Sequence, residues 1–165
     1  MQELLSNKEL YRKIANDIKD YNDVFFIGRE VDYALAQEGS LKLKEISYTH
    51  SEAYAAGELK HGTISLIDEG TPVVSIVTDD EIAPKTISNI KEVKSRGAYV
   101  IGITNDSCDS VSDYYDELIK IPKVNDLFQP LLAIIPLQMI AYELAKIKGC
   151  NIDKPKNLAK SVTVE

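Results

Sequence analysis

Short, uninterrupted apolar runs alternate along this chain with stretches of helical length, and this alternation restricts the fold more than any other feature. The runs cover residues 24–28, 72–78 and 98–104, and a weaker run covers residues 117–121. Continuous apolar runs of this length are typical of strands that are buried on both faces of a parallel sheet. The sequence therefore predicts at least four strands of one parallel sheet.

Helical stretches separate these runs. Apolar residues recur at helical spacing after Ser6, which predicts an amphipathic helix over about residues 7–20. Three more helices are expected, at about residues 33–48, 84–96 and 128–148. Gly97 and Gly149 suit the ends of the last two. Strands that alternate with helices imply right-handed βαβ crossovers, so the predicted class is α/β: a three-layer αβα sandwich of the flavodoxin-like or Rossmann-like type.

Composition limits the kinds of partner that the chain could bind and the cellular compartment in which it is expected. The chain has 165 residues, enough for one self-sufficient domain, and a net charge of −7. Nucleic acid and anionic membranes would be repelled by this charge. Cys108 and Cys150 fit no metal-ligand spacing, so no metal is expected and a reducing cytoplasm is the simplest setting. The N-terminus lacks the apolar core of a secretory signal, and polar residues interrupt the apolar stretch 131–147, which favours a buried helix over a membrane span.

Glu38, Lys42 and Glu45 lie at i, i+4 and i+7 of the second expected helix, so their side chains share one stripe. The neighbouring stripe contains Leu35, Gly39, Leu43 and Ile46 and is expected to be buried. A carboxylate at the edge of such a core can serve as a general base, with the nearby ammonium stabilising negative charge on a substrate. On spacing alone, however, a plain Glu–Lys–Glu ladder on a solvated face is the better reading.

Two histidines and the C-terminal lysines are the other candidates. His61 lies between Gly57 and Gly62, in a polar loop of the kind that often carries catalytic histidines. His50 is better explained as a cap at the end of the second helix. Lys160 lies in a C-terminal segment that lacks helical periodicity. Its amine could form a Schiff base with a ketose, but a frayed end with solvated lysines is the simpler interpretation.

A phosphate-binding loop is missing where this fold would place one. Ligands of open α/β sheets bind beyond the carboxyl ends of the strands, where phosphate needs Gly, Ser or Thr donors without local negative charge. Residues 29–32 contain no Gly-rich motif, and residues 79–81 are all acidic. Residues 105–112 mix serines with aspartates and are more simply read as turn residues.

Two long segments of the sequence favour the catalytic interpretation of these residues over the structural one. Residues 38–62 read EGSLKLKEISYTHSEAYAAGELKHG, and residues 157–165 read NLAKSVTVE. Both closely resemble the C-terminal part of the glucosamine-6-phosphate synthase family, the isomerizing glutamine–fructose-6-phosphate aminotransferases, and the likeness runs from about Val24 to the last residue. In that family this stretch is the second of two sugar isomerase (SIS) domains, preceded by a glutaminase domain and a first SIS domain that this chain lacks.

The resemblance implies a division of the chain and a role for each candidate residue. Residues 1–23 would be a helix that links to an upstream domain, residues 24–149 the SIS domain, and residues 150–165 a tail that contributes to the active site. The resemblance assigns five residues. Glu45 would move a proton between C1 and C2 of the sugar, and Lys42 would assist at the enolamine. Glu38 would orient the reacting groups, His61 would open the sugar ring from the neighbouring subunit of a homodimer, and Lys160 would form the Schiff base.

The substrate implied by the resemblance is fructose 6-phosphate, which becomes glucosamine 6-phosphate with ammonia from glutamine and without a metal or organic cofactor. The family holds the phosphate in its first SIS domain, which accounts for the acidic loops here. The turn at residues 29–32 and Lys156 depart modestly from the family pattern. Since the chain starts at Met1, we expect an excised domain or a separately encoded half. A non-catalytic phosphosugar-binding SIS module and a fructosamine-phosphate deglycase are the alternatives.

Overall fold

The computed structural model describes residues 1–106 and 112–158, and these form one five-stranded sheet in which every neighbouring pair is parallel. The strand order is β2-β1-β3-β4-β5. The strands are β1 (Asp23–Gly28), β2 (His50–Ala55), β3 (Pro72–Val77), β4 (Tyr99–Asn105) and β5 (Glu117–Ile121). The predicted α/β class and its parallel sheet are confirmed.

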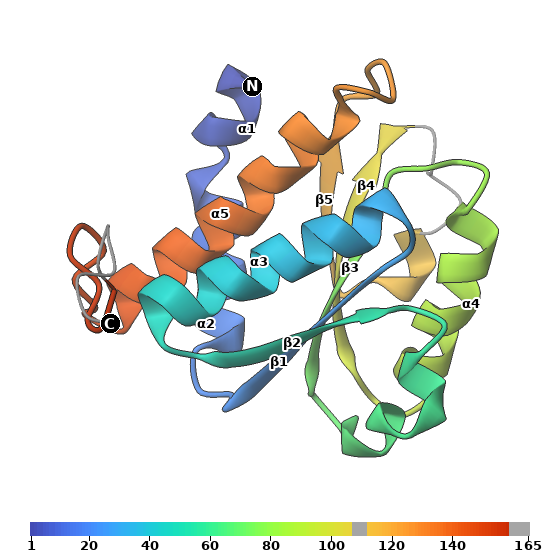
Figure 1. Ribbon diagram of the computed structural model, residues 1–165, viewed down its shortest axis with the longest axis horizontal. Coiled ribbons are helices and arrows are strands. Elements are labelled where there is room, and N and C mark those ends of the chain that lie inside the picture. The colour runs from blue at the N-terminus through green and yellow to red at the C-terminus, as the bar shows by residue number, and fades with distance from the viewer. Residues whose placement is uncertain (107–111, 159–165) are drawn as a thin grey trace, which may run out of the picture.

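Helices cover both faces of the sheet (Figure 1). One face is covered by α1 (Gln2–Ser6), α2 (Lys8–Ile18), α3 (Val31–Ser47) and α5 (Gln129–Ile147). The other is covered by α4 (Ala83–Lys94), with the short 3-10 turns η1 (Leu59–His61) and η2 (Thr63–Leu66) nearby. Neighbouring residues of a strand serve opposite layers: Phe26 packs with α3 and α5, whereas Phe25 and Ile27 pack with α4. The four predicted helices are confirmed to within two or three residues.

Helix α5 is long and apolar enough to cross a membrane by length and composition alone. Its apolar residues, however, lie in the same core as those of α2 and α3, and even Glu143 is buried there. Packing against two helices and the sheet accounts for its composition, as expected for a buried helix of an α/β sandwich.

Strand β2 corrects the prediction that His50 caps the second helix. Helix α3 ends at Ser47, Tyr48 adopts a left-handed conformation with φ 55°, and His50 begins a strand that pairs with β1. The His50 Nδ1 atom lies 2.6 Å from Asp23 Oδ1, its partner in the register of the two strands. This strand lies at the edge of the sheet and contains small and polar residues, so it lacks the apolar run that identified the others.

Gly28, at the end of β1, lets the first turn of α3 approach the sheet. A Cβ atom at this position would lie 2.3 Å from the backbone oxygen of Asp32 and 2.8 Å from the nitrogen of Tyr33. Neither backbone atom can give way without displacing the helix. This glycine therefore fixes where α3 starts, and with it the charged residues that α3 carries.

We expect Gly28→Ala to lower the free energy of unfolding by about 3 kcal/mol, at the upper end of overpacking costs, because the clash is with backbone. Urea unfolding followed by circular dichroism measures this. Gly57→Ala is the matched control, since its Cβ would meet only the flexible guanidinium of Arg29. Equal stability of the two variants would show that α3 is not held by this contact.

Candidate functional site

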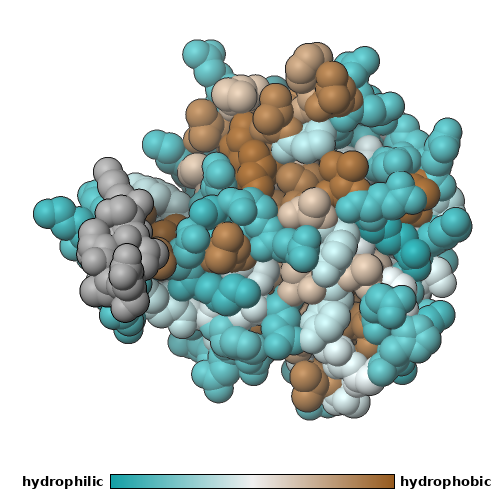
Figure 2. Space-filling model, in the orientation of Figure 1, coloured by the Kyte–Doolittle hydropathy of each residue, from teal (hydrophilic) through white to brown (hydrophobic). Residues whose placement is uncertain are grey.

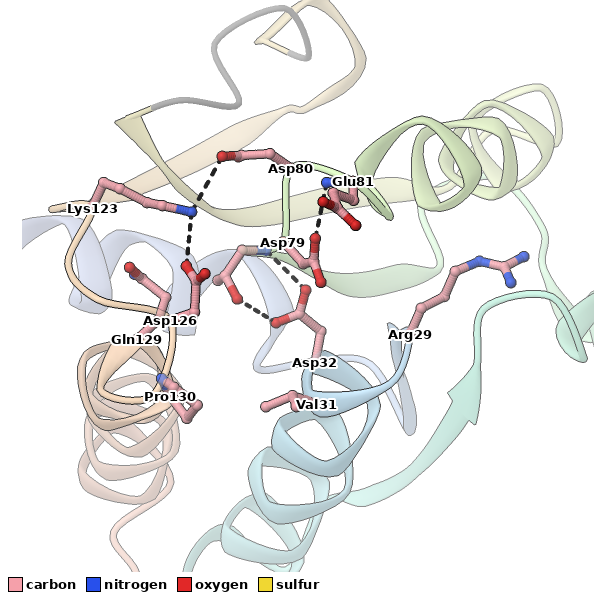
Figure 3. A pocket seen from close by; sticks show the side chains of 11 residues that line it. Arg29, Val31, Asp32, Asp79, Asp80, Glu81, Lys123, Asp126, Gln129 and Pro130 are labelled. Atoms are coloured by element: carbon pink, nitrogen blue, oxygen red, sulfur yellow. Dashed lines mark hydrogen bonds and ion pairs between the residues drawn. The ribbon is translucent and has the colours of Figure 1, made fainter.

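A crevice of about 490 Å³ opens at the carboxyl edge of the sheet (Figure 3). It is lined by the segments that follow β1, β3 and β5, which are three of the four loops where this fold binds ligands. The lining residues are predominantly charged and comprise Arg29, Val31, Asp32, Thr78, Asp79, Asp80, Glu81, Lys123, Asp126, Gln129 and Pro130. Five of these eleven carry carboxylates, so the crevice has a negative lining.

The Asp32 carboxylate occupies the floor of this crevice. It is buried and accepts hydrogen bonds from the Thr78 backbone N–H (2.8 Å) and from the Thr78 hydroxyl (2.5 Å). Burial raises the pKa of Asp32, against the opposing effect of these two hydrogen bonds. The donors at the end of β3 that could bind an anionic ligand are thus already used by the protein's own carboxylate.

The two cations of the crevice are also engaged. Lys123 Nζ lies 3.2 Å from a carboxylate oxygen of Asp80 and 3.2 Å from one of Asp126. The guanidinium of Arg29 points away from the crevice and donates a hydrogen bond to Asn89 Oδ1 (2.9 Å). A phosphate entering here would meet carboxylates rather than donors, in agreement with the prediction from residues 79–81.

The charged stripe of α3 is assembled as predicted. Lys42 Nζ lies 2.7 Å from Glu45 Oε2 and 3.4 Å from Glu38 Oε1. The side chains of Glu45, Lys42 and Glu38 are 26%, 30% and 40% exposed, which places them at the boundary between core and solvent. The hydrogen bond to Glu45 raises the pKa of Lys42, so the ammonium stays protonated and available to stabilise an anion. This arrangement is compatible both with acid–base chemistry and with a structural ladder.

His61 is not brought to this stripe. It lies exposed in η1, beyond the carboxyl end of β2, whereas Glu45 lies in the last turn of α3, just before the amino end of β2. Since β2 has six residues, roughly 16 Å of strand separates the two ends. His61 and Glu45 of one chain therefore lie towards opposite ends of β2.

Lys160 lies outside the described residues, but the segment that leads to it is described. The Lys156 backbone N–H donates a hydrogen bond to Tyr48 Oη (2.8 Å), and Lys156 Nζ lies 4.2 Å from the centre of the Tyr48 ring. No sequence pattern singles out Tyr48 or Asp32, because their roles depend on partners 108 and 46 residues away. Within residues 1–106 and 112–158, no cluster of three or more His, Cys, Asp or Glu side chains could hold a metal ion.

Comparison with known proteins assigns the fold to a family. The profile of the SIS domain matches residues 17–148. The chain belongs to the SIS domain family. This SIS domain is 53% identical over 165 residues to a glutamine–fructose-6-phosphate aminotransferase (isomerizing) of Caldanaerobacter subterraneus, and 54% identical over 164 residues to one of Clostridium tetani. These alignments cover 100% and 99% of the chain but only 27% of each relative, so the chain spans about a quarter of their length.

A solved structure agrees with these sequences. The C-terminal domain of glucosamine-fructose-6-phosphate aminotransferase from Francisella tularensis superposes with a TM-score of 0.87 at 38% identity. The superposition covers 92% of this SIS domain and 43% of that chain. The resemblance seen in the two sequence segments is therefore confirmed by the fold.

The buried Asp32 makes the stability of the SIS domain depend on pH. Its pKa is higher in the folded state than the ordinary value near 4, so the folded state retains this proton better than the unfolded state does. This contribution to stability is therefore lost as the pH rises from about 4 towards 7. Asp32→Asn keeps partners for both Thr78 groups without the buried charge, so we expect the variant to gain stability relative to wild type over this range.

Urea unfolding at several pH values between 4 and 7 measures the difference. Asp20→Asn, which changes an exposed carboxylate, is the control and is expected to leave the pH dependence unchanged. A constant difference between Asp32→Asn and wild type across this range would contradict the assignment of a raised pKa to Asp32.

Proposed function

We propose that this SIS domain is the C-terminal half of the isomerase module of a glutamine–fructose-6-phosphate aminotransferase. In this role it supplies the acid–base and Schiff-base groups that convert fructose 6-phosphate and ammonia to glucosamine 6-phosphate. The single observation that carries the proposal is the half-buried Glu38–Lys42–Glu45 stripe, in a chain that is about half identical to enzymes of that name. A solvated ladder alone would not need the NLAKSVTVE segment and the ELKHG loop in the same chain.

The proposed chemistry gives one step to each of four candidate groups. His61 of the neighbouring subunit opens the sugar ring, and the Lys160 amine adds to the C2 carbonyl and releases water to form an imine. Ammonia then replaces Lys160 on C2. Glu45 takes a proton from C1, the protonated Lys42 stabilises the enolamine that results, and the proton returns to C2. A base, an acid and an imine suffice, so no metal or organic cofactor is needed.

The phosphate would be held outside this chain. The crevice at the carboxyl edge carries its own buried carboxylate and engaged cations, which suits a domain that leaves phosphate binding to a first SIS domain. Hydrophobic side chains gather over α5 and the start of α3 (Figure 2), where Val31, Leu127, Phe128 and Leu131 are exposed. We propose that the missing domains cover part of this face.

The homodimer is proposed because one chain separates two of its own catalytic groups. His61 and Glu45 lie towards opposite ends of β2, which supports the proposal that His61 reaches the site from a second chain. A cytoplasmic location is proposed as well, and the free thiol of Cys150 is consistent with a reducing compartment.

Glu45→Gln and His61→Asn test the mechanism and the dimer together, in an enzyme that carries this SIS domain with its glutaminase and first SIS domains. We expect each variant to lose about 10² to 10⁴-fold in sugar conversion, as for the loss of a general acid or base, while glutamine is still hydrolysed. Co-expression of the two variants should restore about a quarter of wild-type activity, since half of the dimers are mixed and each mixed dimer has one intact site.

Glucosamine 6-phosphate formation and glutamate release are measured in parallel. Glu9→Gln, which changes an exposed glutamate of α2, is the control and is expected to be fully active. Normal sugar conversion by Glu45→Gln would remove that residue from the reaction. Two inactive variants that stay inactive when mixed would contradict a site shared between subunits.

A further inference from the structure

Tyr48 has a backbone conformation that tyrosine does not favour. It follows the last residue of α3 and has φ 55°, in the left-handed region where helices usually place glycine or asparagine. A side chain at such a position adds strain that glycine would avoid, and strain of this kind is retained where the side chain has a task. The contacts of Tyr48 indicate what that task is.

The C-terminal segment returns to the junction of α3 and β2 (Figure 1). Side chains of the two segments contact each other there. Lys148 Nζ donates a hydrogen bond to Thr49 Oγ1 (2.6 Å) just after α5 ends. Farther along, Tyr48 receives both the backbone N–H and the ammonium of Lys156, at 2.8 Å from the hydroxyl and 4.2 Å from the ring centre. These two contacts of Tyr48 with Lys156 are called the anchor below. Asn157, the next residue, has φ 62°, so the backbone turns directly after the anchor.

The anchor lies next to the proposed catalytic stripe. Tyr48 follows Glu45 by three residues, and Lys160 follows Lys156 by four, so Lys160 begins within about 14 Å of the anchor by chain length alone. Among the described residues after Cys150, the contacts of Lys156 with Tyr48 are the only hydrogen bond and cation–ring contact that tie this segment to the end of α3. Fixing Lys156 therefore restricts the volume that the Lys160 amine can search.

We propose that Tyr48 is a positioning residue, which holds Lys156 and so delivers the Lys160 amine to the sugar bound beside Glu45. The role rests on the proposed function, because it assumes that Lys160 forms the imine. Two groups of Tyr48 contribute separately: the hydroxyl accepts the Lys156 N–H, and the ring face attracts the Lys156 ammonium.

The first measurement concerns the anchor alone and uses this 165-residue chain without substrate. Amide hydrogen exchange by NMR should show that the Lys156 N–H exchanges about fivefold faster in Tyr48→Phe, which loses one hydrogen bond, and faster still in Tyr48→Leu. Tyr142→Phe and Tyr142→Leu are matched controls. Tyr142 also has a lysine over its ring, Lys146 at 5.2 Å, but both residues lie within α5. The controls should leave Lys156 unchanged.

The second measurement concerns catalysis in the enzyme that carries all its domains. Tyr48→Leu should lower kcat for glucosamine 6-phosphate formation about tenfold, with KM for fructose 6-phosphate changed less than twofold, because the phosphate is bound elsewhere. Tyr48→Phe should lie between this variant and wild type. Lys156→Arg, which offers a planar cation to the same ring, should retain wild-type kcat.

Unchanged exchange at Lys156 in both Tyr48 variants would overturn the anchor. Faster exchange with unchanged kcat would overturn the positioning role, although the contact exists. If instead the wild-type enzyme forms no glucosamine 6-phosphate, the proposed function fails and the positioning role fails with it, while the exchange data still establish or exclude the anchor.

Discussion

The absence of a side chain at Gly39 lets helix α3 pack closely against Phe26 of β1 and Leu137 of α5. A Cβ atom there would lie 2.9 Å from Leu137 Cδ2 and 3.1 Å from Phe26 Cε1. Leu35 and Leu43 are buried on the same side of the helix. The neighbouring Glu38–Lys42–Glu45 stripe therefore lies at the edge of the core and is partly exposed to water. The close packing at Gly39 therefore places the ion pairs of Lys42 at the edge of the core, where they are partly buried.

In this domain, the crevice at the carboxyl edge of the sheet and the candidate catalytic stripe of α3 lie apart. Open α/β sheets bind ligands at the carboxyl edge, but here Asp32 and the Lys123 ion pairs occupy that crevice. The Glu38–Lys42–Glu45 stripe lies instead in the C-terminal half of α3, toward the end to which the C-terminal segment returns. Under the proposed function, the remaining groups of the site come from other domains and from a second subunit.

Much of the fold could be predicted, because the buried strands and amphipathic helices leave strong periodic signals. Strand β2 could not, since an edge strand with the sequence HSEAYA needs no apolar run. The Glu38–Lys42–Glu45 contacts followed from helical spacing alone. The Tyr48–Lys156 contact did not, because it joins residues 108 positions apart and no local pattern encodes such a pair.

The proposed function requires that the sugar carbonyl react beside α3 and not in the crevice at the carboxyl edge. Borohydride reduction of the complete enzyme with fructose 6-phosphate, followed by peptide mapping, tests it directly because reduction fixes any imine on the lysine that formed it. We expect one adduct, on Lys160, and none on Lys123 in the crevice. An adduct on Lys123, or turnover without any adduct on Lys160, would show that the sugar does not react with Lys160 beside α3.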